Sequence, residues 1–150
     1  MKKHYTAAAL LMLSTLATAQ AQDASRIANK IMGPDGQPEM VQFTAEGKAA
    51  LRGLSGDQVL RQQLALTTAD QMVQRSAEAD QIGMVHQRFA QFYQGIRVEH
   101  ADYIVHSKSG AVEAINGDFE RITNLNITPS VSQKTALNSA LAHVGARTYM

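Results

Sequence analysis

The second half of the chain alternates apolar and polar residues in short runs, and each run ends at residues that favour turns. Such runs predict strands over 84–93, 96–106, 111–115 and 119–122. Gly95 separates the first two runs, Ser107 to Gly110 predicts a four-residue hairpin connection, and Asn116-Gly117 is a tight-turn pair because both residues tolerate a positive φ. Strands joined by connections this short pair antiparallel. This half of the chain therefore predicts an antiparallel β-meander.

A helix is predicted after the meander, over 133–144. Ser132 is a favourable N-cap, and Gly145 stands just past the last periodic residue, where glycine is favoured. The apolar residues of the helix form one stripe: Ala136, Leu137, Ala140, Leu141 and Val144. No strand pattern follows to cover this stripe, so residues 129–150 are expected to begin a second module that is truncated.

The region before the meander gives weaker signals. Residues 22–55 are expected to be a loosely structured lead-in, with a short helix over 23–32, a loop over 33–38 rich in glycine and proline, and a strand over 38–44. Ser55 is a plausible N-cap for one or two helical turns, whose apolar residues are Val59, Leu60 and Leu64.

The N-terminus has the pattern of a secretory signal peptide. Lys2 and Lys3 precede an apolar run over 6–18, and small residues then allow cleavage after Ala19 or Ala21. The apolar run is shorter than the roughly 20 residues that a membrane span needs. Residues 1–21 are therefore predicted to be a signal peptide, and the mature chain is expected to be secreted from a bacterium, with no membrane contact after cleavage.

Composition excludes several classes of function. The chain has 14 Lys and Arg, 13 Asp and Glu, and no cysteine. Without the two leader lysines, 12 basic residues face 13 acidic ones, for a net charge of −1. Such a balance gives no electrostatic reason to bind nucleic acid or anionic lipid. The absence of cysteine excludes disulfide scaffolds, thiolate metal sites and cysteine nucleophiles.

The sequence also lacks the common catalytic motifs: no H-E-x-x-H, G-x-S-x-G or phosphate-binding loop occurs. The best metal candidates are His100, Asp102 and His106 on one strand face. Their i, i+2, i+6 spacing covers about 20 Å along a strand, too far for one ion, so we interpret them as solvated surface residues. We therefore predict no catalytic, cofactor or metal site in this chain.

Two further groups of residues receive a structural interpretation. The carboxylates near the predicted Asn116-Gly117 turn, Glu113, Asp118 and Glu120, are expected to form a solvated rim. The aromatic residues Phe89, Phe92 and Tyr93 are expected to pack in a core rather than to bind a ligand.

The stretch from His86 to Val98 resembles the hallmark of the fungalysin/thermolysin propeptide (FTP) family, H-x-R-[YF]-x-Q-x-Y-x-G-[IV]-P-V. A D-x-x-G turn, Asp80 to Gly83, precedes it as in the family. The hallmark proline is replaced by Arg97, so the strand keeps an N–H donor there. The matching positions, with those of the later turns, are His86, Arg88, Phe89, Gln91, Tyr93, Gly95, Ile96, Val98, Gly110, Asn116 and Gly117.

The resemblance implies an α+β fold: a cystatin-like antiparallel meander with flanking helices. It implies an FTP-like propeptide domain over 56–128 and the start of a PepSY-like module over 129–150. It further implies the N-terminal propeptide of a secreted thermolysin-like zinc metalloendopeptidase, acting as intramolecular chaperone and inhibitor. The partner is then the chain's own downstream catalytic domain, which would hold the zinc. The alternative is a stand-alone secreted binding or inhibitor module.

The motif residues are expected to serve structure. Strand alternation places His86 and Arg88 on one face and Gln91 on the other with Phe89 and Tyr93, so their polar groups diverge. We expect them to satisfy backbone or side-chain partners at the border with the catalytic domain.

Overall fold

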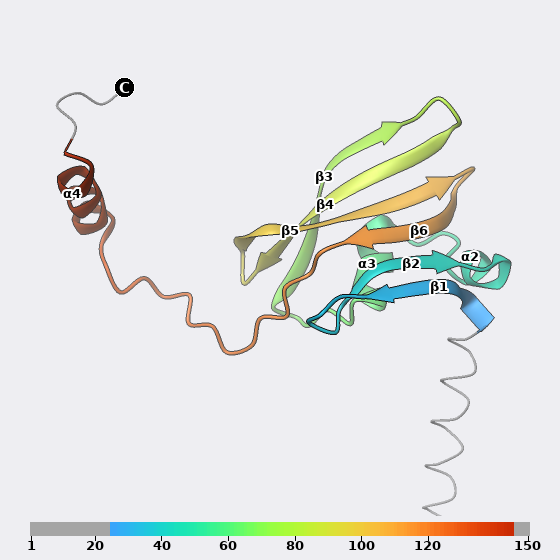
Figure 1. The fold of residues 1–150 in the computed structure, drawn as a ribbon, viewed down its shortest axis with the longest axis horizontal. Helices are drawn as coiled ribbons and strands as arrows, with labels where there is room; N and C mark the ends of the chain where they lie inside the picture. Colours follow the sequence, from blue (N-terminus) through green and yellow to red (C-terminus); the bar gives the residue numbers. More distant parts are fainter. Residues whose placement is uncertain (1–24, 146–150) are drawn as a thin grey trace, which may run out of the picture.

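The computed structural model describes residues 25–145, which form one antiparallel sheet with helices beside it. The elements in chain order are β1 (Ile27–Met32), β2 (Pro38–Phe43), α2 (Ala45–Ala50), α3 (Gly56–Gln63), β3 (Asp70–Ala79), β4 (Met84–Tyr93), β5 (Ile96–Lys108), β6 (Ala111–Gly117) and α4 (Gln133–Val144). The six strands have the order β1-β2-β6-β5-β4-β3 (Figure 1). The α+β class and the antiparallel meander are thus confirmed.

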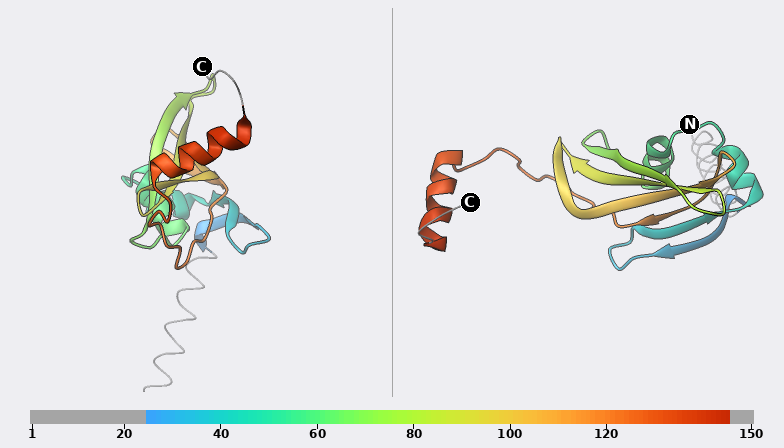
Figure 2. Two further views of the ribbon diagram at one scale, coloured as in Figure 1. Left: turned by 90° about the vertical axis from the view of Figure 1, so that its left-hand side faces the viewer. Right: turned by 90° about the horizontal axis from the view of Figure 1, so that it is seen from above.

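One face of the sheet carries the hydrophobic core. In neighbouring strands, Val41, Ile115 and Val105 are paired in register and all at most 1% exposed. Helices α2 and α3 lie over this face (Figure 2), and Val59, Leu60 and Leu64 of the α3 region complete the core. Among the described residues, no helix covers the opposite face, which we call the open face.

The N-terminal part belongs to this sheet. Residues 27–32, predicted as the end of a short helix, form strand β1. Helix α2 is a further ordered element that was not expected within the loosely structured lead-in over 22–55. Ile27 and Ile31 stand four residues apart, as on one face of a helix, but pairing of β1 with β2 overrides this weak local preference. The loop over 33–37, strand β2 and helix α3 are confirmed.

The meander differs from its prediction at three points. The β5–β6 connection has two residues, Ser109 and Gly110, because β5 continues to Lys108. Asn116 and Gly117, predicted as a tight turn, are the last residues of β6, paired with Ile104 and Tyr103. Residues 119–122 form no strand, for a reason given below.

Helix α4 has its predicted bounds. The Ser132 hydroxyl accepts a hydrogen bond from Thr135 N, and Gly145 has φ +62° at the other end. An extended segment carries α4 away from the sheet, and every residue of the helix is exposed (Figures 1 and 2).

The predicted signal peptide, with Ala19 and Ala21, lies outside the described residues. Among the residues that are described, none of the helices is long and apolar enough to span a membrane.

Candidate functional site

Strand β4 carries most of the hallmark residues and alternates between the two faces as predicted. Phe89, Gln91 and Tyr93 are buried on the helix side of the sheet. Arg88 is exposed on the open face, and His86 is half-buried there. The polar groups of His86, Arg88 and Gln91 therefore do not converge on one site.

Phe89 is the contact between this strand and helix α3. Its ring is 2% exposed. A Cβ built on Gly56, the first residue of α3, would lie 2.5 Å from Phe89 Cζ. Only a glycine allows the helix to approach the ring this closely, so Gly56 and Phe89 together position α3 on the sheet.

Gln91 uses its buried side chain as a substitute for a neighbouring strand. Its Nε2 donates to the Glu120 carbonyl at 2.8 Å, and its Oε1 accepts from the Glu120 N–H at 2.9 Å. The amide thus satisfies both backbone groups of Glu120. Because the Gln91 side chain holds Glu120, the segment after β6 lies against the sheet without forming the strand predicted over 119–122.

Arg121 extends this attachment to the end of α3. Its guanidinium donates to the carbonyls of Leu64, at 2.6 Å, and Ala65, at 3.1 Å. It also lies 4.8 Å from the centre of the Phe119 ring, and Phe119 is buried in the core. Orphan carbonyls at a helix C-terminus are favourable partners for a cation. Sequence reasoning gave Arg121 no role, because no local pattern links it to residues more than fifty positions earlier.

His86 belongs to a chain of polar contacts on the open face. His86 Nδ1 lies 2.7 Å from His106 Nδ1, His86 Nε2 lies 3.4 Å from Asp80 Oδ2, and His106 Nε2 lies 2.5 Å from Asn116 Oδ1. Between the two Nδ1 atoms, one ring donates a hydrogen bond and the other accepts it.

Asp80 anchors that chain of contacts at the turn between β3 and β4. Its Oδ1 accepts from Ile82 N at 3.0 Å and from Met84 N at 2.8 Å, and Gly83 has φ +77°. The hydrogen bond from Met84 N, followed by smaller effects including those of Ile82 N and His86, lowers the pKa of Asp80 below 3.8. The D-x-x-G turn is thus present as predicted.

The metal candidates of strand β5 are not brought together. Between Asp102 and Arg97 the pairing with β4 is interrupted by a bulge, and His100 within it has φ +64°. The bulge breaks the alternation that put His100, Asp102 and His106 on one face, and His106 contacts His86 and Asn116 instead. Within residues 25–145 no three His, Asp or Glu side chains could hold one metal ion.

The glycines of the motif fall into two kinds. Gly95, with Gln94, and Gly110, with Ser109, form two-residue turns in which both residues have a positive φ. Gly117 is in a strand with φ +149°, and a Cβ there would lie 2.2 Å from the Asp102 carbonyl oxygen. Gly117 is therefore required by the close approach of β5, rather than by a turn.

The remaining predicted residues have structural surroundings. Val98 is half-buried within the bulge. Of the three carboxylates expected on a solvated rim, Glu113 forms an ion pair with Lys48 of α2, and Glu120 is held through its backbone. Asp118 donates its N–H to the Asp102 carbonyl at 3.0 Å.

Tyr103 is a buried polar residue that sequence reasoning did not single out. It is 0% exposed, and its hydroxyl has no hydrogen-bond partner among the described residues. Burial, with the negative charges of Asp118, Asp35 and Glu39, raises the pKa of Tyr103. Because its neutral phenol is unpaired, this residue contributes packing rather than acid–base chemistry.

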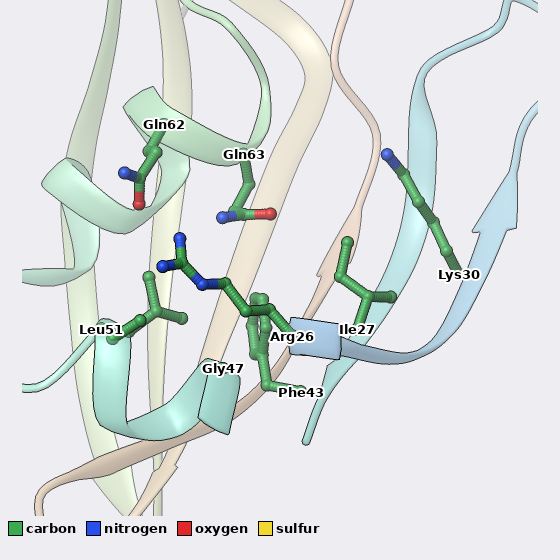
Figure 3. Close-up of a pocket in the computed structure, with 9 residues that line it drawn as sticks. Arg26, Ile27, Lys30, Phe43, Gly47, Leu51, Gln62 and Gln63 are labelled. Atoms are coloured by element: carbon green, nitrogen blue, oxygen red, sulfur yellow. The ribbon is translucent and has the colours of Figure 1, made fainter. Parts of the chain in front are cut away.

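A cavity of about 190 Å³ lies between the start of β1 and helices α2 and α3 (Figure 3). The Arg26 side chain points into it toward Gln62 and Gln63. Among the described residues, its polar lining consists of cations and amides, without a carboxylate or histidine. General acid–base catalysis needs a group that can take up and release a proton near neutral pH. The described lining of this cavity contains no such group.

Comparison with protein families identifies a known motif in this part of the chain. The Fungalysin/Thermolysin Propeptide Motif matches residues 70–119. The match begins at β3, ends after β6 at Phe119, and includes Gln91, His86 and Gly117. A search of curated proteins found no match to the chain. Residues 70–119 therefore form an FTP motif, and the resemblance read from the sequence is confirmed over this segment.

Proposed function

We propose that this chain is the N-terminal propeptide region of a secreted thermolysin-like zinc metalloendopeptidase, acting as intramolecular chaperone and inhibitor of the downstream catalytic domain. The match of residues 70–119 to the propeptide motif carries the proposal. The motif residues support it because they build a rigid sheet rather than a reaction centre.

A rigid sheet can act as a folding template by binding only the native form of its partner. Binding of this kind stabilises the partner by about 2.7 kcal/mol when the ligand is present at a hundred times its Kd. A covalent link raises the effective concentration to the millimolar range for short flexible connections, so even weak docking suffices. The open face offers a surface for this docking, since no described helix covers it.

Inhibition requires only that the bound propeptide block access to the catalytic cleft. No zinc ligand or acid–base group from this chain is needed for that role. Zinc would belong to the catalytic domain, where it would activate the attacking water.

We further propose that α4 begins a second, PepSY-like module. The stripe of Leu137, Leu141 and Val144 supports this assignment because these side chains are 56%, 37% and 64% exposed. A helix with one apolar face is stabilised by covering that face.

The test starts from the coding sequence after Met150, which is expected to encode an H-E-x-x-H motif and a more distant glutamate. That catalytic domain is then produced separately and titrated with the purified chain while peptide hydrolysis is followed. Saturable inhibition is expected, and full activity in a large excess of folded chain would contradict the proposal. A stop codon soon after a completed PepSY module would instead favour the alternative, a stand-alone secreted binding or inhibitor module.

A further inference from the structure

The open face carries a groove lined by three arginines from three neighbouring strands. Arg75 of β3, Arg88 of β4 and Arg97 of β5 line a cavity of about 210 Å³, together with Asp102, Tyr103 and Ile104. We call these three side chains the arginine groove. All three are exposed.

Two β-bulges bring these arginines together. Arg75 is the extra residue where the pairing of β3 with β4 shifts between Gln74 and Ser76. Arg97 lies at the edge of the large bulge in β5. Bulges change the direction of side chains along a strand. Arg97 also occupies the position of the proline in the family hallmark, so the third guanidinium distinguishes this chain from that pattern.

The groove has an excess of positive charge. Its single carboxylate, Asp102, lies 3.9 Å from Arg97, and both side chains are about half exposed, at 54% and 43%. Such an exposed pair is weak. Neither Arg75 nor Arg88 has an ion-pair partner among the described residues. Three like charges in one groove repel one another. They suit a ligand with carboxylate groups, which guanidinium binds through two parallel hydrogen bonds.

A second, mostly apolar cavity meets the groove at Arg97 and indicates what kind of anion would bind. This second cavity, of about 190 Å³, shares Arg97 with the groove, and its other lining residues are Tyr93, Ile96, Val98, Ile122, Leu125 and Ile127. Ile96 and Leu125 are 52% and 54% exposed. A free phosphate ion would not use this apolar surface. A nucleic acid would need a longer positive surface than a mature chain of net charge −1 provides.

We propose that the arginine groove and the adjoining apolar cavity bind an acidic protein segment that carries an apolar side chain near its carboxylates. Under the proposed function this segment belongs to the surface of the metallopeptidase partner. The binding site itself does not depend on that identity, because it is defined by charge and shape.

The test measures binding of a fluorescein-labelled peptide of four glutamates followed by two leucines to the full chain, by fluorescence anisotropy at low salt. The variant R75Q/R88Q/R97Q is expected to bind at least about tenfold more weakly, since three exposed charge pairs are lost. The matched control K30Q/R52Q/K134Q removes three exposed cations elsewhere, so it has the same net charge, and it is expected to bind within twofold of the unaltered chain. If the triple variant fails to fold, the single variant R97Q replaces it, and its affinity for the peptide is expected to be about threefold lower than that of the unaltered chain.

Three results would overturn the inference: no binding by the unaltered chain, equal weakening in both triple variants, or displacement of the peptide by inorganic phosphate at equal carboxylate and phosphate concentrations. A peptide in which glutamines replace the glutamates must bind more weakly than the acidic one. If the peptide fails to bind while the chain still inhibits its metallopeptidase domain, the groove assignment is wrong and the proposed function stands.

Discussion

The attachment of Glu120 by Gln91 leads to a prediction about stability. Gln91 is 0% exposed and its amide makes two hydrogen bonds to one backbone unit. Gln91→Leu keeps a similar side-chain volume and removes both bonds. Each such bond contributes about 0.5–1.5 kcal/mol net, so the free energy of unfolding should fall by about 1–3 kcal/mol.

Thermal unfolding followed by circular dichroism measures this change. For a chain of this size, about 4 °C of Tm corresponds to each kcal/mol, so Tm should fall by roughly 4–12 °C. Hydrogen exchange gives a second, local readout, because the Glu120 N–H loses its acceptor and should exchange faster than the amides of β4.

Gln87→Leu is the matched control. It lies on the same strand, and its Nε2 donates to Gln74 Oε1 in an exposed contact at 3.2 Å. Exposed substitutions of this kind stay within about 0.5 kcal/mol. Equal Tm values for the two variants would refute the assignment of Gln91 as the residue that holds the segment after β6.

Three further predictions concern single sites. Gly117→Ala should lower the free energy of unfolding by more than Gly110→Ala does. Gly110→Ala costs about 1–2 kcal/mol of backbone strain, whereas a Cβ at Gly117 would also lie 2.2 Å from the Asp102 carbonyl oxygen. Equal losses of Tm in the two variants would contradict this prediction. Tyr103→Phe should be as stable as the unaltered chain or more stable by about 1 kcal/mol, since it removes a buried hydroxyl without a described partner, and a lower urea midpoint would count against it. Because the pKa of Asp80 is lowered in the folded chain, the ionised carboxylate stabilises the fold fully above pH 3.8, and this stabilisation is lost as the pH falls below that value. The Asp80→Asn variant should therefore lose less Tm on acidification than the unaltered chain. Equal losses of Tm on acidification in the two proteins would disprove this prediction.

The meander could be predicted because its signals are local. The aromatic-rich run over 84–93 gives strand β4 with its observed bounds, and Ser132 and Gly145 delimit α4. The faces of His86, Arg88 and Gln91 followed from strand period alone. These features depend on residues that are neighbours in sequence.

Other features depend on contacts between distant residues, and local patterns do not contain them. Strand β3 was not predicted because Met72 is the single apolar residue that it buries, although the D-x-x-G turn implies a strand before it as well as after it. The Asn116-Gly117 pair was misjudged because a glycine required by a neighbouring strand looks the same in sequence as one required by a turn. The bulges that gather Arg75 and Arg97 appear only when strand pairing is known.

The central claim, that this chain helps a metallopeptidase domain to fold, is tested most directly by refolding in trans. The catalytic domain that we propose as the partner is denatured and diluted into buffer with and without the purified chain. The chain is then removed by limited proteolysis, and active sites are titrated. The account predicts a yield of active sites that rises with chain concentration and reaches a plateau near one chain per domain, with unchanged turnover per site. A yield that is the same with and without the folded chain would contradict it.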